Sequence, residues 1–145
     1  MPPAIVASHR VHGEGWGDVA VTPQWRLVGG FTLMHESFRV RSGATDLGAS
    51  SLGNDPKRTA TLRSLWNVSP DHELDVRARY MGELPSPKVP AYTVVDVRLG
   101  WHVSRKLDLS LLVANVFDRE HREFADANTG VVLGRSAFLK ATWTP

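Results

Sequence analysis

The sequence contains no cysteine in its 145 residues, which excludes disulfide bonds and thiolate metal sites. No apolar run approaches the roughly 20 residues that a transmembrane helix needs. Lysine and arginine form no continuous run, and the formal net charge of +2 is close to neutral, so nucleic acid is not an expected partner. The length predicts one domain over residues 1–145, and a soluble domain of this size could bury an adequate core.

Recognisable chemical motifs are missing as well. The opening MPPAIVASHR lacks a basic segment followed by an apolar core, so we expect no signal peptide on this chain. The spacing of Gly13, Gly15 and Gly17 differs from the nucleotide-binding fingerprint. There is no nucleophile elbow, and we expect all 6 histidines to be solvated polar side chains. The sequence therefore predicts no enzyme, no metal site and no cofactor.

What the sequence does have is a regular alternation of uncharged and charged or polar residues, which is clearest between residues 89 and 117. Successive side chains of a strand point to opposite faces. Two segments in this stretch place uncharged residues on one face and charged residues on the other. A helical period would instead mix Asp96 and Asp108 with the apolar positions. The stretch predicts a β-hairpin that turns at residues 104–106.

The same alternation extends over most of the chain. It predicts further strands at 8–21, 25–38, 57–69, about 74–80 and 132–143. Short turns at 22–24, 70–72 and 104–106 alternate with long loops at 39–56, 83–90 and 118–131. Short periplasmic turns opposite long loops are typical of outer-membrane barrels. The predicted fold class is all-β: about seven antiparallel strands forming a segment of a transmembrane β-barrel.

Aromatic residues indicate which face meets lipid. Four tryptophans share the apolar face near the short turns: Trp25, Trp66, Trp101 and Trp143. Tyr80 and Phe117 share that face near the opposite rim. Aromatic rings at both edges of an apolar band form the girdles of a membrane barrel, because an indole suits the membrane interface.

The opposite face carries the charges. They are Arg26, Arg63, Asp75, Arg77, Arg79, Asp96, Arg98, Asp108 and Lys140. A charge that faces lipid costs roughly 2–4 kcal/mol at the bilayer midplane, whereas a water-filled lumen tolerates it. The division of residues therefore predicts an apolar face toward lipid and a charged face toward an aqueous lumen.

Four arginines on that charged face are candidate ligand-binding residues: Arg63, Arg77, Arg79 and Arg98. On adjacent antiparallel strands they would line one patch of the lumen. A guanidinium offers a planar donor fork, so attraction of an anionic ligand is one interpretation. The interpretation we favour is ion pairing with Asp75, Asp96 and Asp108. In a larger barrel, some of these groups could instead face a domain that fills the lumen.

An ordered series of short motifs resembles the closing strands of TonB-dependent outer-membrane receptors. In chain order they are Trp16-Gly17-Asp18, Thr22-Pro23-x-Trp25-Arg26-Leu27, Gly53-Asn54-Asp55-Pro56, Leu84-Pro85-x-Pro87, Arg98-Leu99-Gly100-Trp101, Leu107-x-Leu109-Ser110-Leu111 and Asn115-x-Phe117-Asp118. The likeness covers the chain from about His12 to Trp143. It implies the C-terminal part of a receptor barrel for scarce nutrients, most often ferric siderophores.

The resemblance also implies the location and the partners. The location is the outer membrane of a Gram-negative bacterium. The partners are outer-membrane lipid, the remainder of the barrel with its plug, and TonB, which acts through an N-terminal region. Residues 1–145 contain neither that region nor a plug, so we expect an excerpt of a receptor or a truncated product that is inactive alone.

Two other classes stay open at this point. One is a small outer-membrane barrel that acts as a passive pore or a lipid enzyme. The even strand number usual for bacterial single-chain barrels argues against it. The other is a soluble β-barrel or sandwich that binds a small ligand, because a soluble barrel also alternates, with its apolar face inward.

Overall fold

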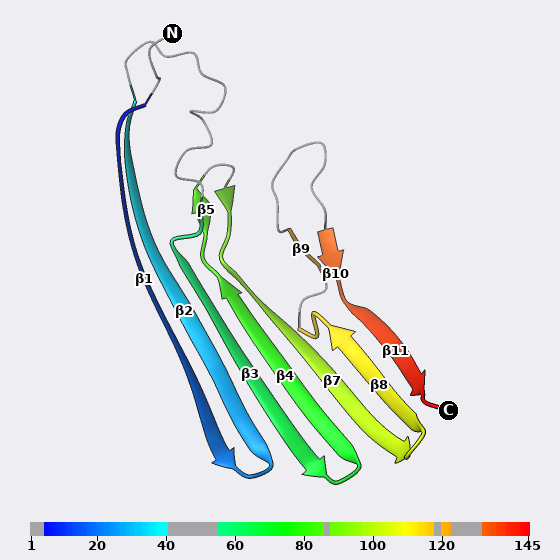
Figure 1. The fold of residues 1–145 in the computed structure, drawn as a ribbon. Helices are drawn as coiled ribbons and strands as arrows, with labels where there is room; N and C mark the ends of the chain where they lie inside the picture. The colour runs from blue at the N-terminus through cyan, green and yellow to red at the C-terminus, as the bar shows by residue number, and fades with distance from the viewer. Residues whose placement is uncertain (1–4, 41–54, 86–87, 118–119, 123–131) are drawn as a thin grey trace.

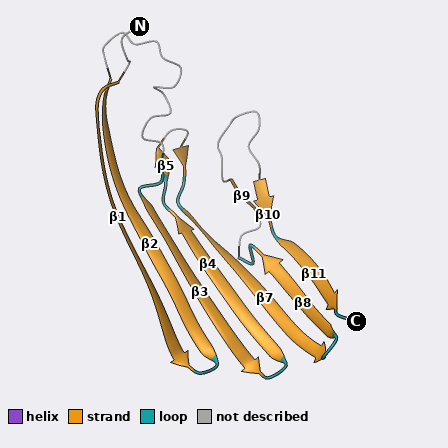
Figure 2. Ribbon diagram, viewed as in Figure 1, coloured by secondary structure: helices purple, strands orange, loops and turns teal. Residues whose placement is uncertain are grey.

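A computed structural model describes residues 5–40, 55–85, 88–117, 120–122 and 132–145. These residues form strands joined by turns and short irregular segments (Figure 2). Among them is no helix of the length and apolar character needed to cross a membrane. The predicted all-β class is confirmed.

Seven strands form one antiparallel sheet (Figure 1). They are β1 (Ile5–Thr22), β2 (Trp25–Val40), β3 (Arg58–Ser69), β4 (His72–Met81), β7 (Tyr92–Ser104), β8 (Leu107–Ala114) and β11 (Ser136–Trp143). Their order in space, β1-β2-β3-β4-β7-β8-β11, follows the chain, so β1 and β11 are the edges of the described sheet. The predicted number of about seven strands is confirmed.

Three two-residue turns lie together at one end of the sheet, here named the short-turn rim (Figure 1). They join β1 to β2, β3 to β4 and β7 to β8, as the sequence predicts. A hydroxyl at the end of the first strand shapes each turn by accepting a hydrogen bond from the backbone N–H two residues later. The hydroxyls belong to Thr22, Ser69 and Ser104, with donor–acceptor distances of 3.2, 3.3 and 3.2 Å.

The first departure from the sequence prediction is the proline-rich segment 83–90, for which a loop is expected. It contains a small ladder between β5 (Leu84–Pro85) and β6 (Lys88–Val89). Leu84 pairs with Val89, and Pro85 pairs with Lys88. Proline is tolerated at a sheet edge because its missing N–H is not needed there, so two residues of ladder can form beside it.

The second departure concerns the end of the chain. The expected strand at 132–143 is two strands, β10 (Val132–Gly134) and β11, because each pairs with a different partner. β11 pairs with β8, whereas β10 pairs with β9 (Glu120–Arg122), inside the expected loop 118–131. Residues 123–131 of that loop, like residues 41–54 of the loop expected at 39–56, lie outside the described residues.

The register aligns apolar residues of neighbouring strands in rows. One row holds Trp25, Trp66, Leu74, Leu99, Leu111 and Leu139. The next row toward the short-turn rim holds His72, Trp101, Leu109 and Ala141. We name this side of the sheet the apolar face. The alternate positions form the polar face, and the nine charged residues of the sequence prediction all lie there. The predicted division of faces is confirmed.

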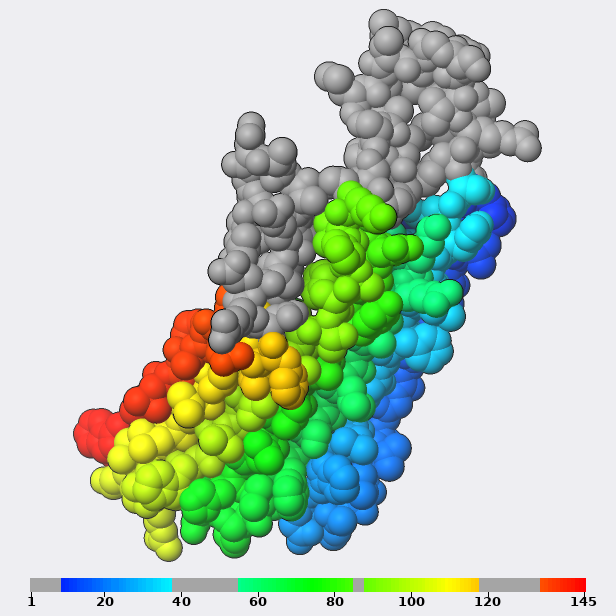
Figure 3. Space-filling model, turned by 180° about the vertical axis from the view of Figure 1, so that it is seen from behind, coloured from blue at the N-terminus to red at the C-terminus, as the bar shows by residue number. Residues whose placement is uncertain are grey.

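The sheet is a single layer, and the apolar face is not covered by another described element. Val89 and Val94, each 3% exposed, are the only described hydrophobic residues that are buried. On the apolar face, Leu99 is 50% and Leu139 is 77% exposed. Seen from behind, the strands form a continuous layer from β1 to β11 (Figure 3). A soluble sandwich would pack a second layer against such a face.

Candidate functional site

The polar face carries ion pairs that cross from strand to strand. Arg98 Nη1 on β7 lies 2.8 Å from Glu73 Oε2 and 2.9 Å from Asp75 Oδ2, both on β4. Asp75 is directly opposite Arg98, whereas Glu73 is opposite Gly100. Because Gly100 has no side chain, the Arg98 guanidinium can lie over it and reach Glu73.

We expect Gly100→Ala to weaken this ion pair. The added methyl group would lie 2.9 Å from Glu73 Oε2 and 3.1 Å from Arg98 Nη2, so at least one partner must move. The pair is partly exposed, and the expected cost is therefore about 0.5–1 kcal/mol. The unfolding temperature of the assembled protein measures it. Gly17→Ala is the matched control, because its methyl group meets nothing within 4 Å. Equal shifts in the two variants would contradict the prediction.

His102 extends the network toward the short-turn rim. Its Nδ1 lies 2.7 Å from Asp108 Oδ1, and its Nε2 lies 3.1 Å from Glu73 Oε1. One imidazole thus links β4, β7 and β8. His102 is exposed, as the prediction of solvated histidines expects, and so is His72, whose ring stacks on Trp101 with centroids 5.9 Å apart. Both contacts are made across strands, so they depend on the register.

The four candidate arginines share the polar face, as predicted. Arg79 Nη2 lies 3.7 Å from Asp96 Oδ2, and Asp96 also accepts a hydrogen bond of 3.0 Å from the Asn115 backbone N–H. Arg63 and Arg77 lie directly opposite each other, and neither has an ion pair or a side-chain hydrogen bond with a described residue. The favoured interpretation, ion pairing, therefore holds for Arg79 and Arg98.

The acidic partners also differ in part from the prediction. Asp75 and Asp96 pair with arginine as predicted. Asp108 instead contacts His102. Glu73, which is not among the acidic partners predicted from the sequence, contacts both Arg98 and His102. Glu73 is the second residue of β4, so the alternation along the sequence does not clearly assign it to a face.

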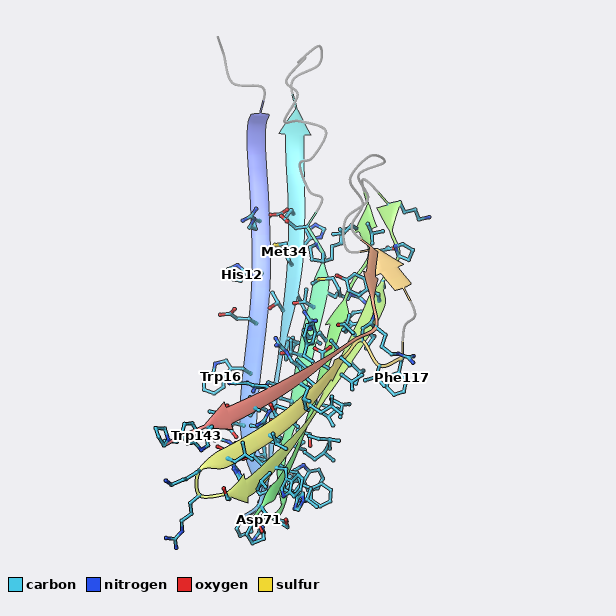
Figure 4. The ribbon with its side chains drawn as sticks, turned by 90° about the vertical axis from the view of Figure 1, so that its right-hand side faces the viewer. His12, Trp16, Met34, Asp71, Phe117 and Trp143 are labelled. Atoms are coloured by element: carbon cyan, nitrogen blue, oxygen red, sulfur yellow. The ribbon has the colours of Figure 1, made fainter. Side chains whose placement is uncertain are left out.

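The β1–β2 side of the polar face holds a further aromatic residue, Trp16, which is 84% exposed. Trp16 pairs with Gly30, whose missing side chain leaves the polar face open beside the indole. Figure 4 shows His12 and Trp16 extending from the same side of β1. The alternation alone could have found Trp16, because it lies two residues from both Glu14 and Asp18, unlike the other four tryptophans.

Ion pairs flank Trp16 on both sides along the strands. Arg10 pairs with Glu36, and Arg26 pairs with Asp18, with Arg26 Nε donating to Asp18 Oδ1 at 2.7 Å. In the described ranges, no group of three or more histidine, aspartate or glutamate residues could hold a metal ion. Among the described residues, the polar face thus presents an exposed indole and two guanidinium groups without carboxylate partners. An indole offers an aromatic surface, and a guanidinium attracts an anion.

Comparison with known proteins identifies this architecture. Residues 8–116 match the family model described as TonB dependent receptor-like, beta-barrel. The catecholate siderophore receptor Fiu of Escherichia coli (strain K12) is 32% identical over 110 residues, which cover 70% of this chain and 14% of that protein. PiuA of Acinetobacter baumannii, named as a probable TonB-dependent siderophore receptor, is 28% identical over 153 residues, covering 94% of this chain and 21% of that protein.

Solved structures agree with the sequence comparison. The closed form of the ferric-catecholate import receptor Fiu from E. coli K12 superposes with a TM-score of 0.69 at 27% identity. The open form gives a TM-score of 0.67 at 23% identity, which supports the fold alone. Each superposition covers 85% of this chain and 19% of the other. The chain thus spans a small part of the length of the proteins that it matches.

Proposed function

The chain belongs to the TonB-dependent receptor β-barrel family, and we propose that it supplies seven neighbouring strands to a receptor barrel that imports a ferric siderophore across the outer membrane. The observation that carries the proposal is the division of the sheet into two faces. Aligned rows of leucine and tryptophan cover the apolar face. Between the short-turn rim and the opposite end of the sheet, the charged residues lie on the polar face. That the strands are the last of the barrel stays a prediction.

The two faces give the orientation in the membrane. The apolar face contacts lipid, because a charge there would cost roughly 2–4 kcal/mol at the midplane. The polar face lines the lumen, where water solvates the ion pairs. The short-turn rim is periplasmic, as short turns are in bacterial barrels. Tryptophans near this rim, such as Trp66 and Trp101, lie at the level of the lipid headgroups.

The polar face also favours a class of ligand. The Fiu relatives are named catecholate siderophore receptors, and a deprotonated catechol is both aromatic and anionic. Arg63 and Arg77 face the lumen without carboxylate partners among the described residues, so they are available to attract such a ligand. Arg79 and Arg98 are ion-paired and serve mainly to link strands. The remaining partners are the rest of the barrel, the plug and TonB, which supplies the energy for transport.

Neutralising Arg63 and Arg77 together should weaken import by the intact receptor. We expect Arg63→Gln with Arg77→Gln to raise the half-saturating concentration of a radiolabelled ferric tris-catecholate by at least about tenfold, because the loss of even one charged hydrogen bond costs about 1.5–3 kcal/mol and 1.4 kcal/mol is a factor of ten. Lysine at both positions keeps the charge and is the matched control. Immunoblots of outer membranes check receptor levels. Unchanged uptake by the glutamine variant would remove these residues from the ligand path.

A further inference from the structure

Trp16 has a different environment from the other tryptophans of the sheet. It pairs with Gly30 on the polar face, and it is 84% exposed among the described residues. The other four tryptophans lie on the apolar face near the short-turn rim, where aromatic rings suit the membrane interface. Trp16 instead lies six residues before the end of β1, about 20 Å from that rim at about 3.3 Å per residue. The membrane interface therefore does not account for this indole.

The polar face beside Trp16 carries small, uncharged residues. Gly30 is the neighbour on β2, and Thr61 follows it in the same row on β3. A Cβ at position 30 would lie 3.5 Å from the Cβ of Trp16, so any side chain there would occupy the space next to the tryptophan. A glycine inside a strand often marks a place where a ligand approaches the backbone closely. A planar group therefore has room to lie over Gly30 against the indole.

Two arginines that have no ion pair with a described residue lie near this surface. Arg63 and Arg77 pair with each other on β3 and β4, in the next row of the polar face toward the short-turn rim. Arg63 lies two strands and two residues from Trp16. Their Cα atoms are therefore about 12 Å apart, at about 4.8 Å between strands and about 3.3 Å per residue. Both side chains are long, so one ligand between them can contact the indole and the guanidinium groups together.

The two acidic neighbours of Trp16 on β1 leave this place open to an anion. Asp18 lies in the same row as Arg63, but its carboxylate is paired with Arg26. Glu14 lies two residues from Trp16 in the direction away from the short-turn rim, whereas Arg63 lies toward the rim. An anion between Trp16 and Arg63 therefore approaches the guanidinium groups and stays farther from the Glu14 carboxylate.

We propose that Trp16 makes the receptor specific for ligands whose metal-binding groups are aromatic rings. One ring of a ferric tris-catecholate stacks on the indole, while Arg63 and Arg77 contact the negatively charged oxygens that bind the iron. The arginines recognise charge and the tryptophan recognises the ring, because a guanidinium attracts any anion whereas stacking needs a flat aromatic surface. The inference rests on the proposed function, because it requires the polar face to line the path of an imported siderophore.

Two chromium(III) complexes separate recognition of the ring from recognition of the charge. Tris-catecholatochromate and tris-oxalatochromate carry the same negative charge and the same octahedron of oxygens, but only the first has aromatic rings. Chromium(III) exchanges its ligands slowly, so both complexes stay intact during the measurement. Equilibrium dialysis against outer-membrane vesicles that contain the intact receptor gives the two dissociation constants. We expect the tris-catecholate to bind about fivefold more tightly, because one stacking contact is worth about 1 kcal/mol.

Variants assign the two kinds of contact. Trp16→Leu should remove the preference by weakening the binding of the tris-catecholate about fivefold, with the tris-oxalate unchanged. Trp16→Phe keeps an aromatic ring and should retain most of the preference. Trp66→Leu is the matched control, because it removes an indole from the apolar face and should leave both dissociation constants unchanged. Arg63→Gln with Arg77→Gln should weaken the binding of both complexes, since their charges are equal.

The remaining outcomes separate the role of Trp16 from the proposed function. Equal weakening of both complexes by Trp16→Leu would show that Trp16 supports the barrel or contacts another part of the receptor, and would overturn the inference. A preference that survives Trp16→Leu would also overturn it, while the proposed function stands. Binding of neither complex would overturn the inference as well, and uptake of the ferric tris-catecholate by the same cells would show whether the proposed function fails with it.

Discussion

Replacing Leu111 with arginine should prevent the receptor barrel from assembling, whereas the same replacement at Leu112 should be tolerated. Leu111 pairs with Leu99 and Leu139 on the apolar face. Leu112, the next residue along β8, pairs with Arg98 on the polar face. The first variant places a charge in lipid near the middle of β8, at a cost of up to about 2–4 kcal/mol. The second places it in the lumen, near the carboxylates of Glu73 and Asp75.

Heat modifiability of the receptor in outer-membrane fractions measures this pair of variants. A folded barrel migrates differently before and after boiling, and we expect that folded band to be lost for Leu111→Arg and kept for Leu112→Arg. The two variants share residue type, strand and net charge, so the comparison isolates the direction of the side chain. Folding of both, or of neither, would contradict the assignment of faces.

Alternation was sufficient to predict the sheet, because a period of two decides the face of every residue before any partner is known. Trp25 and Trp66 illustrate this. Their shared face follows from counting along each strand, and the structure adds only that they are directly paired, with ring centroids 6.4 Å apart. The short turns were predicted for a similar reason, since turn residues follow local chemistry.

Contacts across strands could not be predicted, because they require the register. Glu73 reaches Arg98 only because Gly100 lies between them on the neighbouring strand. The position of His102 between two carboxylates likewise depends on the pairing of β7 with both β4 and β8.

The β5–β6 ladder was missed for another reason. Proline dominates its sequence, and two paired residues are too few to show a period.

A polypeptide of residues 1–145 by itself should fail to insert into the outer membrane, even when it is exported to the periplasm. The described sheet has two edges, β1 and β11. β1 alone is 18 residues long, and its outer edge pairs with no other described strand. In lipid, each unsatisfied backbone group costs several kcal/mol, so that only a closed barrel is stable there. Seven strands are also fewer than the eight of the smallest bacterial barrels.

The same residues should fold when further strands of the receptor close the barrel. We expect neighbouring strands of the whole receptor to pair with the outer edges of β1 and β11, which would satisfy the backbone groups that cost most in lipid. Outer-membrane fractions from cells expressing either form allow the comparison, with the whole receptor as the control for expression and export. We expect a heat-modifiable band from the receptor alone. A folded, membrane-inserted monomer of residues 1–145 would show that this sheet can close on itself, and would contradict the assignment of β1 and β11 as open edges.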